Sequence, residues 1–109
     1  MTTITIYTTK DGEYKGISCK GHAGYSYSGK DIVCSAISVL VINSVNSWEK
    51  LTHEEMKSRT DSKRGIIECK FTKPLSEDGI LLMKSLILGL KGIVKDYGKK
   101  YLELKFKEV

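Results

Sequence analysis

The sequence predicts a small α+β sandwich, in which two helices pack on a mixed or antiparallel sheet in the order β-β-α-β-β-α-β. Short segments with alternating apolar and polar residues predict the strands, and two longer stretches with apolar residues at helical spacing predict the helices. A length of 109 residues is typical of one domain, here residues 1–109. That length excludes a multidomain enzyme and a full dinucleotide-binding fold.

The first two strands are expected at residues 2–9 and 13–20. In the first of them isoleucines alternate with threonines, which favour extended backbone. Asp11 and Gly12 lie between the two segments, and this pair is typical of a tight hairpin turn. The sequence therefore predicts that the chain opens with an antiparallel hairpin.

The first helix is expected at residues 32–50, with Asp31 as its N-cap. Apolar residues occupy most of its circumference: Ile32, Val33, Ala36, Ile37, Val39, Leu40, Val41, Ile42, Val45 and Trp48. A helix that is apolar on nearly all sides must be buried on more than one side, for example by a sheet and by a second subunit. The alternative is a buried strand at residues 39–42, but the length of the segment and its lack of Gly and Pro favour the helix.

Two further strands are expected at residues 54–60 and 65–72, paired around a turn at 61–65. The first of them is weakly patterned. Pro74 ends this unit, because proline removes a backbone donor and fixes its own backbone angle.

The second helix begins after Ser76, whose hydroxyl is suited to cap it. Charges of the sign that the helix dipole favours lie at its two ends: Glu77 and Asp78 in the first turn, Lys91 and Lys95 near the end. Gly98 is a suitable stop. A last strand is expected at residues 101–109, with Leu102, Leu104 and Phe106 on one face.

Charge and cysteine content indicate the environment of the protein. The formal net charge is +5, which permits contact with nucleic acid, but lysines and acids are interleaved, as on an ordinary soluble surface. Three cysteines cannot form a closed set of disulfides within one chain. Residues 1–10 lack a secretory pattern, and the uncharged stretch 32–48 is too rich in Ser and Asn for a membrane span. We therefore expect a cytoplasmic protein without membrane contact.

The stretch 21–36 holds the candidate chemistry, because it joins a strand to a helix through a glycine-rich loop that contains His22. With Asp31 as the cap, Cys34 is the third residue of the first helical turn, where unpaired N–H groups favour a thiolate. A thiolate, a base such as His22 and free backbone donors are the parts of an acyl-transfer site. The alternative is a small buried cysteine and an unrelated surface histidine.

Two other patterns in this stretch point to a bound ligand. Residues 24–31 nearly match a phosphate-binding loop, but Asp31 stands where a hydroxyl must hold magnesium. Cys19 and His22 have the spacing of half a zinc site, which Cys34, His53 or Cys69 would have to complete, yet no second close pair exists. We expect neither a metal nor a cofactor.

Two motifs carry a resemblance: Gly-His-Ala-Gly at 21–24 and Asp-x-Val-Cys-x-Ala-x-Ser at 31–38. With their spacing and the order of predicted elements, the chain resembles the ribosomal-processing cysteine protease (Prp) family over essentially its whole length. The resemblance implies a homodimeric, cytoplasmic bacterial peptidase without cofactor. Its substrate would be the precursor of a large-subunit ribosomal protein, from which it removes a short N-terminal extension that is apolar with adjacent phenylalanines near the cut.

Residue roles follow from matching these motifs: Cys34 corresponds to the nucleophile and His22 to its general base. Several residues are candidates for substrate-loop or supporting roles: Gly21, Gly24 and Gly29 in the loop, Asp31 as cap or as a partner of His22, and Ser38 one turn after Cys34. The Ser38 hydroxyl is expected to bond near the site or to a carbonyl one turn back. A second hypothesis is a non-enzymatic ribosome- or RNA-associated module that uses the basic surface; for the peptidase, nucleic acid would not be obligatory.

Overall fold

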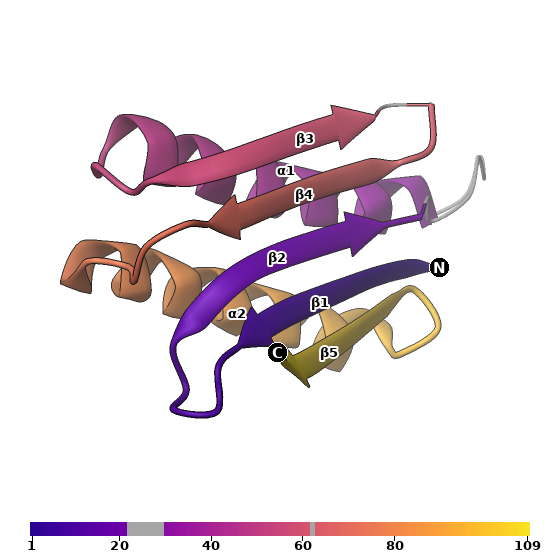
Figure 1. Cartoon of the computed structure of the whole chain (residues 1–109). Helices are drawn as coiled ribbons and strands as arrows, with labels where there is room; N and C mark the ends of the chain where they lie inside the picture. Colours follow the sequence, from indigo (N-terminus) through magenta and orange to yellow (C-terminus); the bar gives the residue numbers. More distant parts are fainter. Residues whose placement is uncertain (22–29, 62) are drawn as a thin grey trace.

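The computed structural model describes residues 1–21, 30–61 and 63–109, and only the backbone of residues 30 and 31 (Figure 1). The elements follow the predicted order: β1 (Thr2–Thr8), β2 (Tyr14–Lys20), α1 (Lys30–Lys50), β3 (Met56–Asp61), β4 (Ile66–Phe71), α2 (Glu77–Tyr97) and β5 (Leu102–Glu108). The strand alternative for residues 39–42 is wrong, because these residues lie inside α1.

The five strands form one mixed sheet in the order β3-β4-β2-β1-β5. β1 pairs with β5 in parallel, whereas the other three pairs are antiparallel. Both helices lie on the same side of this sheet and run in opposite directions (Figure 1). The predicted α+β architecture is confirmed, and the described part of the chain places no helix over the other face.

The hairpin between β1 and β2 turns where the sequence predicts it. Gly12 has a φ of 86°, a left-handed conformation that favours glycine, and its N–H donates to the Thr9 carbonyl at 2.9 Å. In the resulting register Ile4 lies opposite Cys19, and Ile6 lies opposite Ile17. All four of these side chains are buried, so they mark the helix-covered face of the sheet.

The core lies between this face and the two helices. From α1 the fully buried or nearly buried side chains are Val33, Ile37, Val41, Val45 and Trp48. Trp48 packs edge-on against Phe71, with ring centroids 4.9 Å apart, and its indole N–H donates to the Gly79 carbonyl at 3.1 Å. By length and composition α1 is long and apolar enough to cross a membrane, yet one side of it forms part of this core.

The second helix begins and ends at the predicted residues. The Ser76 hydroxyl accepts a hydrogen bond from the Gly79 N–H at 3.1 Å, as an N-cap should. At the other end the Gly98 N–H donates to the Val94 carbonyl, and Gly98 has a φ of 92°.

Candidate active site

Cys34 lies near the beginning of α1, at the edge of the core. It is half-buried, whereas Val33 before it is fully buried and Ser35 after it is exposed. All three cysteines carry free thiols. Cys34 is therefore a thiol with partial access to solvent, which is what a nucleophile needs and a core cysteine lacks.

The first helix begins two residues earlier than the sequence predicts, at Lys30 instead of Ile32. Because Lys30 is already helical, Asp31 lies within the first turn and the prediction of Asp31 as N-cap is wrong. Cys34 is then the fifth helical residue, just beyond the N–H groups that lack helical partners. Any stabilisation of a thiolate by those groups acts on Cys34 from the preceding turn.

The end of β2 faces the Cys34 thiol. Burial and, to a smaller extent, the neighbouring Cys34 together raise the pKa of the Cys19 thiol to about 11. Cys19 points into the core next to the last residues of β2. Cys34 on α1 and the end of β2 therefore form the two sides of one site, and Figure 1 shows the beginning of α1 beside that strand end.

Gly21 fixes the path by which the chain leaves β2. Its N–H donates to the Gly65 carbonyl at 3.0 Å, and its φ is 100°. A Cβ atom at this position would lie 2.6 Å from the Met1 carbonyl oxygen, a contact that only a backbone shift would relieve. Of the three glycines that the sequence singled out, Gly21 is thus an anchor with a required conformation rather than a freely moving hinge.

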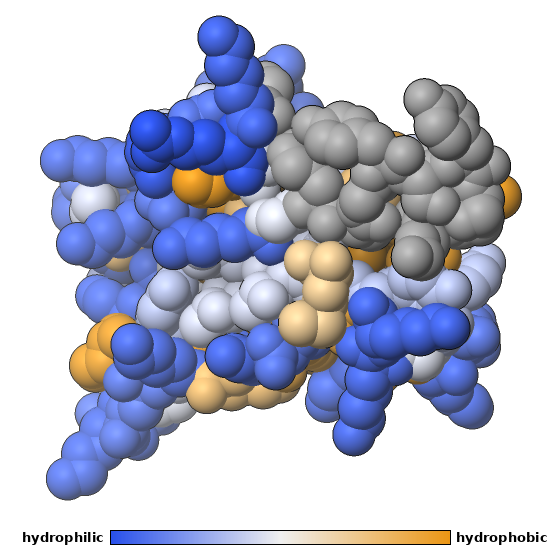
Figure 2. Space-filling view, turned by 90° about the vertical axis from the view of Figure 1, so that its right-hand side faces the viewer, coloured by the Kyte–Doolittle hydropathy of each residue, from blue (hydrophilic) through white to orange (hydrophobic). Residues whose placement is uncertain are grey.

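His22 directly follows this anchor in the sequence, but His22, Gly24 and Gly29 lie outside the described residues. The pairing of His22 with Cys34 and the lid role of the loop therefore stay predictions. Figure 2 views the molecule from the end where β2 ends and α1 begins. Hydrophilic side chains project around the rim of this end, and less polar ones lie toward its centre.

Ser38 lies one helical turn after Cys34 and is half-buried. In the same helix the Ser44 and Ser47 hydroxyls donate to carbonyls one turn back, at 2.8 and 2.7 Å. Over residues 1–21, 30–61 and 63–109 no such bond is found for Ser38. Of the two predicted roles, the bond to a carbonyl is therefore not formed.

Thr2 is a buried polar residue beside the site that sequence reasoning missed. Its side chain is 2% exposed, and its hydroxyl has no hydrogen-bond partner among the residues that the structure describes. Its Cα atom lies 3.6 Å from the position of a Cβ built on Gly21, so it adjoins the exit from β2. The signal was present, because alternation places Thr2 on the same face as Ile4 and Ile6.

The other residues considered as metal ligands, Cys69 and His53, have different surroundings. No group of three His, Cys, Asp or Glu side chains suited to a metal occurs in the part of the chain that the structure describes. The Cys69 thiol instead contacts the Met56 sulfur at 3.7 Å, and burial raises its pKa to about 12. His53 lies after α1 and is exposed.

Comparison with known proteins shows which protein family the chain resembles. The family model described as "Cysteine protease Prp" matches residues 1–102. The "Ribosomal processing cysteine protease Prp" of Staphylococcus aureus is 25% identical over 99 residues, which are 91% of this chain and 93% of the relative.

Solved structures agree in fold. An S. aureus Prp structure with a covalently linked product peptide has a TM-score of 0.87 at 25% identity, covering 98% of this chain and all of the other. A protein from Streptococcus mutans has a TM-score of 0.85 at 26% identity, covering 100% of this chain and 99% of the other.

Proposed function

Since this chain belongs to the Prp family of cysteine proteases, we propose that it is the endopeptidase that removes the short N-terminal extension of a large-subunit ribosomal protein precursor. The relative from S. aureus is named for ribosomal processing, and a related S. aureus structure holds a substrate peptide. The observation that carries the proposal is the half-buried Cys34 on α1 beside the anchored exit of β2.

In the proposed reaction His22 acts as general base toward Cys34. The imidazole takes the thiol proton, and the thiolate attacks the carbonyl carbon of the scissile bond. The imidazolium then protonates the leaving amine, which breaks the peptide bond and leaves a thioester on Cys34. Water, deprotonated by the same imidazole, hydrolyses this thioester and restores the thiol.

The position of Cys34 supports the nucleophile assignment. Cys19 and Cys69 are buried, and burial raises the pKa of both thiols to about 11 and about 12, so both remain protonated near neutral pH. Cys34 is the cysteine with access to solvent. We also propose that Ser38 and the loop glycines Gly24 and Gly29 support substrate binding, since they flank Cys34 in the helix or connect it to the histidine.

A cleavage assay on the ribosomal protein precursor of the same cell tests the proposal. Wild-type enzyme should release the extension, and Cys34→Ala should leave the precursor intact while circular dichroism shows a folded chain. Ser35→Ala is the matched control, because Ser35 is the exposed neighbour of Cys34 on the same helix. Cleavage by the Cys34→Ala variant would contradict the assignment of the nucleophile.

We further propose a homodimer formed through the outer side of α1. Ile32, Val39 and Ile42 are 68%, 65% and 46% exposed there, and no charged residue occurs between residues 32 and 48. A second copy can cover such a surface without burying a charge. In sedimentation experiments Val39→Asp should give monomers, whereas Leu51→Asp, an equal change at an exposed site after α1, should leave the dimer intact. Dimers of Val39→Asp would refute this interface.

A single domain and a cytoplasmic location complete the proposal. All seven elements share one sheet or pack on it, and the buried apolar side chains form one cluster. Three free thiols, one of them the proposed nucleophile, favour a reducing compartment.

A further inference from the structure

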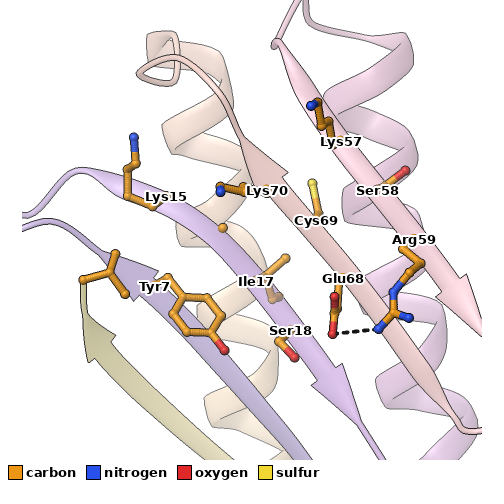
Figure 3. Close-up of a pocket in the computed structure, with 12 residues that line it drawn as sticks. Tyr7, Lys15, Ile17, Ser18, Lys57, Ser58, Arg59, Glu68, Cys69 and Lys70 are labelled. Atoms are coloured by element: carbon orange, nitrogen blue, oxygen red, sulfur yellow. Dashed lines mark hydrogen bonds and ion pairs between the residues drawn. The ribbon is translucent and has the colours of Figure 1, made fainter.

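Three lysines on the uncovered face of the sheet lie next to one another on adjacent strands. Lys57 on β3 lies directly opposite Lys70 on β4, and Lys70 lies opposite Gly16 on β2, the neighbour of Lys15. Figure 3 shows the three lysines on adjacent strands, and the ion pairs among the described residues include none of them. We call Lys15, Lys57 and Lys70 the lysine row.

The lysine row is unfavourable for the fold by itself. Like charges directly opposite each other on neighbouring strands destabilise a sheet. One step along the same two strands, Arg59 lies opposite Glu68 and forms an ion pair with it at 3.2 Å. The same strand pair thus pairs opposite charges at one position and like charges at the next, which indicates that an external anion completes the lysine row.

A hollow of about 610 Å³ lies among these residues. Tyr7, Gly16 and Ser18 line it together with the lysine row. Gly16 has no side chain, and a Cβ atom there would lie 2.5 Å from the Cys69 carbonyl oxygen, so the sheet surface stays bare at this point. Tyr7 lies opposite Gly16, which leaves space beside its ring.

We propose that this face binds a single-stranded segment of RNA. Phosphate groups would contact the lysine row, and a base would stack on Tyr7 above Gly16, as sheet surfaces with cations and an aromatic residue allow. The Tyr7 and Ser18 hydroxyls line the same hollow and are donors and acceptors suited to the ribose 2′-hydroxyl. The net charge of +5 also favours a negatively charged partner such as RNA, because a basic protein surface would be repelled.

The RNA surface is distinct from the candidate active site. Cys34 lies on α1, which covers the opposite face of the sheet, at the end where β2 finishes, whereas the lysine row lies near the beginning of β2. An enzyme with both features would hold RNA on one face while a peptide is cut on the other. RNA binding requires no catalytic residue, so the two proposals stand or fall separately.

Fluorescence anisotropy with a labelled, unstructured RNA of about twelve nucleotides tests this inference. We expect the double variant Lys57→Thr/Lys70→Thr to bind the RNA about tenfold more weakly than wild type. Its logarithmic salt slope should be smaller by about 1.4, since each phosphate contact on a single strand contributes about 0.7. Lys84→Thr/Lys95→Thr is the matched control, because it removes two exposed lysines of α2 and the same charge.

The thermal midpoint supplies a second readout. The Lys57→Thr/Lys70→Thr variant should melt at an equal or higher temperature, because a like-charge pair is replaced by residues that favour strands. Unchanged RNA affinity in this variant, an equal loss in the control, equal affinity for a DNA strand of the same sequence, or equal competition by polyglutamate would each overturn the proposal. Cleavage of a peptide substrate by the variant should stay at the wild-type rate.

Discussion

The two helices each span 21 residues on the same face of the sheet, but their first turns differ in how they are fixed. The beginning of α2 is tied down: the Ser76 N–H and hydroxyl donate to the Glu54 carboxylate at 2.8 and 2.7 Å, and Trp48 bonds the Gly79 carbonyl. The beginning of α1 instead follows the stretch with His22 and presents the half-buried Cys34. Hydrogen bonds that stabilise the fold gather at the start of α2, and the proposed chemistry lies at the start of α1.

Glu54 shows how firmly the α2 end is held. Burial alone would raise the pKa of this carboxyl, but hydrogen bonds from Ser76 and Thr52, together with nearby His53, outweigh burial and lower it. A carboxyl with a lowered pKa stabilises the fold above its unfolded value of about 4.3, and this contribution is lost as the pH falls through the folded value. The hydrogen bonds of Glu54 should therefore stabilise the α2 end less as the solution becomes acidic.

The largest expected difference is in thiol reactivity, between Cys34 at the start of α1 and the two buried cysteines. With its pKa raised to about 11, roughly one Cys19 in three thousand is a thiolate at pH 7.5, and Cys69 still fewer. Iodoacetamide should therefore modify one thiol, Cys34, in the folded protein and three after denaturation. Mass spectrometry of the digested protein identifies the site; rapid labelling of Cys19 in the native state would remove the distinction.

The same pKa values predict instability in alkali. Unfolded cysteine ionises near pH 8.5, whereas the buried thiols resist ionisation, so the stability they provide is complete below about 8.5 and declines as the pH rises toward 11. Urea unfolding at pH 7.5, 9 and 10 measures the decline. A Cys69→Val variant, which cannot ionise there, should show a smaller one.

Gly21→Ala should damage the α1 end more than any change at the α2 end. A methyl group at this position displaces the backbone that leads to His22, and a shift of about 1 Å in a catalytic group can cost about 100-fold in rate. Gly12→Ala is the control, since Gly12 also has positive φ but a Cβ there meets no atom within 4 Å. If Gly21→Ala and Gly12→Ala lose the same activity at the same stability, the backbone position fixed by Gly21 is not what the activity depends on.

Ser76→Ala should have the opposite effect to Gly21→Ala: it should lower stability and leave the cleavage rate unchanged. Loss of an N-cap costs about 1 kcal/mol of stability, and here the bond to Glu54 is lost with it. Peptide cleavage below the melting temperature should stay unchanged, because Ser76 lies on α2, away from Cys34. Urea unfolding and cleavage rates separate the two effects, and a large fall in cleavage by folded protein would show that the two helix starts are coupled.

The smallest expected difference is in stability, between alanine substitutions at two glycines inside α2. Replacing Gly92, around which a Cβ meets nothing within 4 Å, by alanine should stabilise the helix by about 0.5 to 1 kcal/mol. At Gly89 the Cβ would lie 3.2 Å from Leu40 on α1, so Gly89→Ala should gain less. If both variants raise the thermal midpoint equally, Leu40 on α1 moves aside for the new methyl group at little cost.

All seven elements could be predicted from the sequence because each carries its own local signal. Threonines and isoleucines alternate in β1, and Ser76 and Gly98 bound α2. The start of α1 was placed two residues late because Asp31 is a good cap by type, whereas the backbone is already helical at Lys30. Residue type gives a preference for a position, but the path of the preceding chain decides it.

The sequence proposes a nucleophile and a base but not their surroundings. Cys34 and His22 are proposed from motif and position, while the proximity of Cys19 to Cys34 depends on which strand end meets α1. The anchor at Gly21 requires Met1 and Gly65, which are remote in sequence. Likewise, the lysine row exists only because β3 and β4 pair in one register. Such contacts between distant segments leave no local pattern.

The parallel pairing of β1 with β5 has a consequence for biosynthesis. β1 is the first strand of the chain and β5 the last, and about a hundred residues separate the partners Thr2 and Leu102. Until residues 102–108 have been made, β1 has one open edge, and Leu102 is absent from the core. A nascent chain therefore cannot acquire the finished sheet until synthesis has passed the last strand.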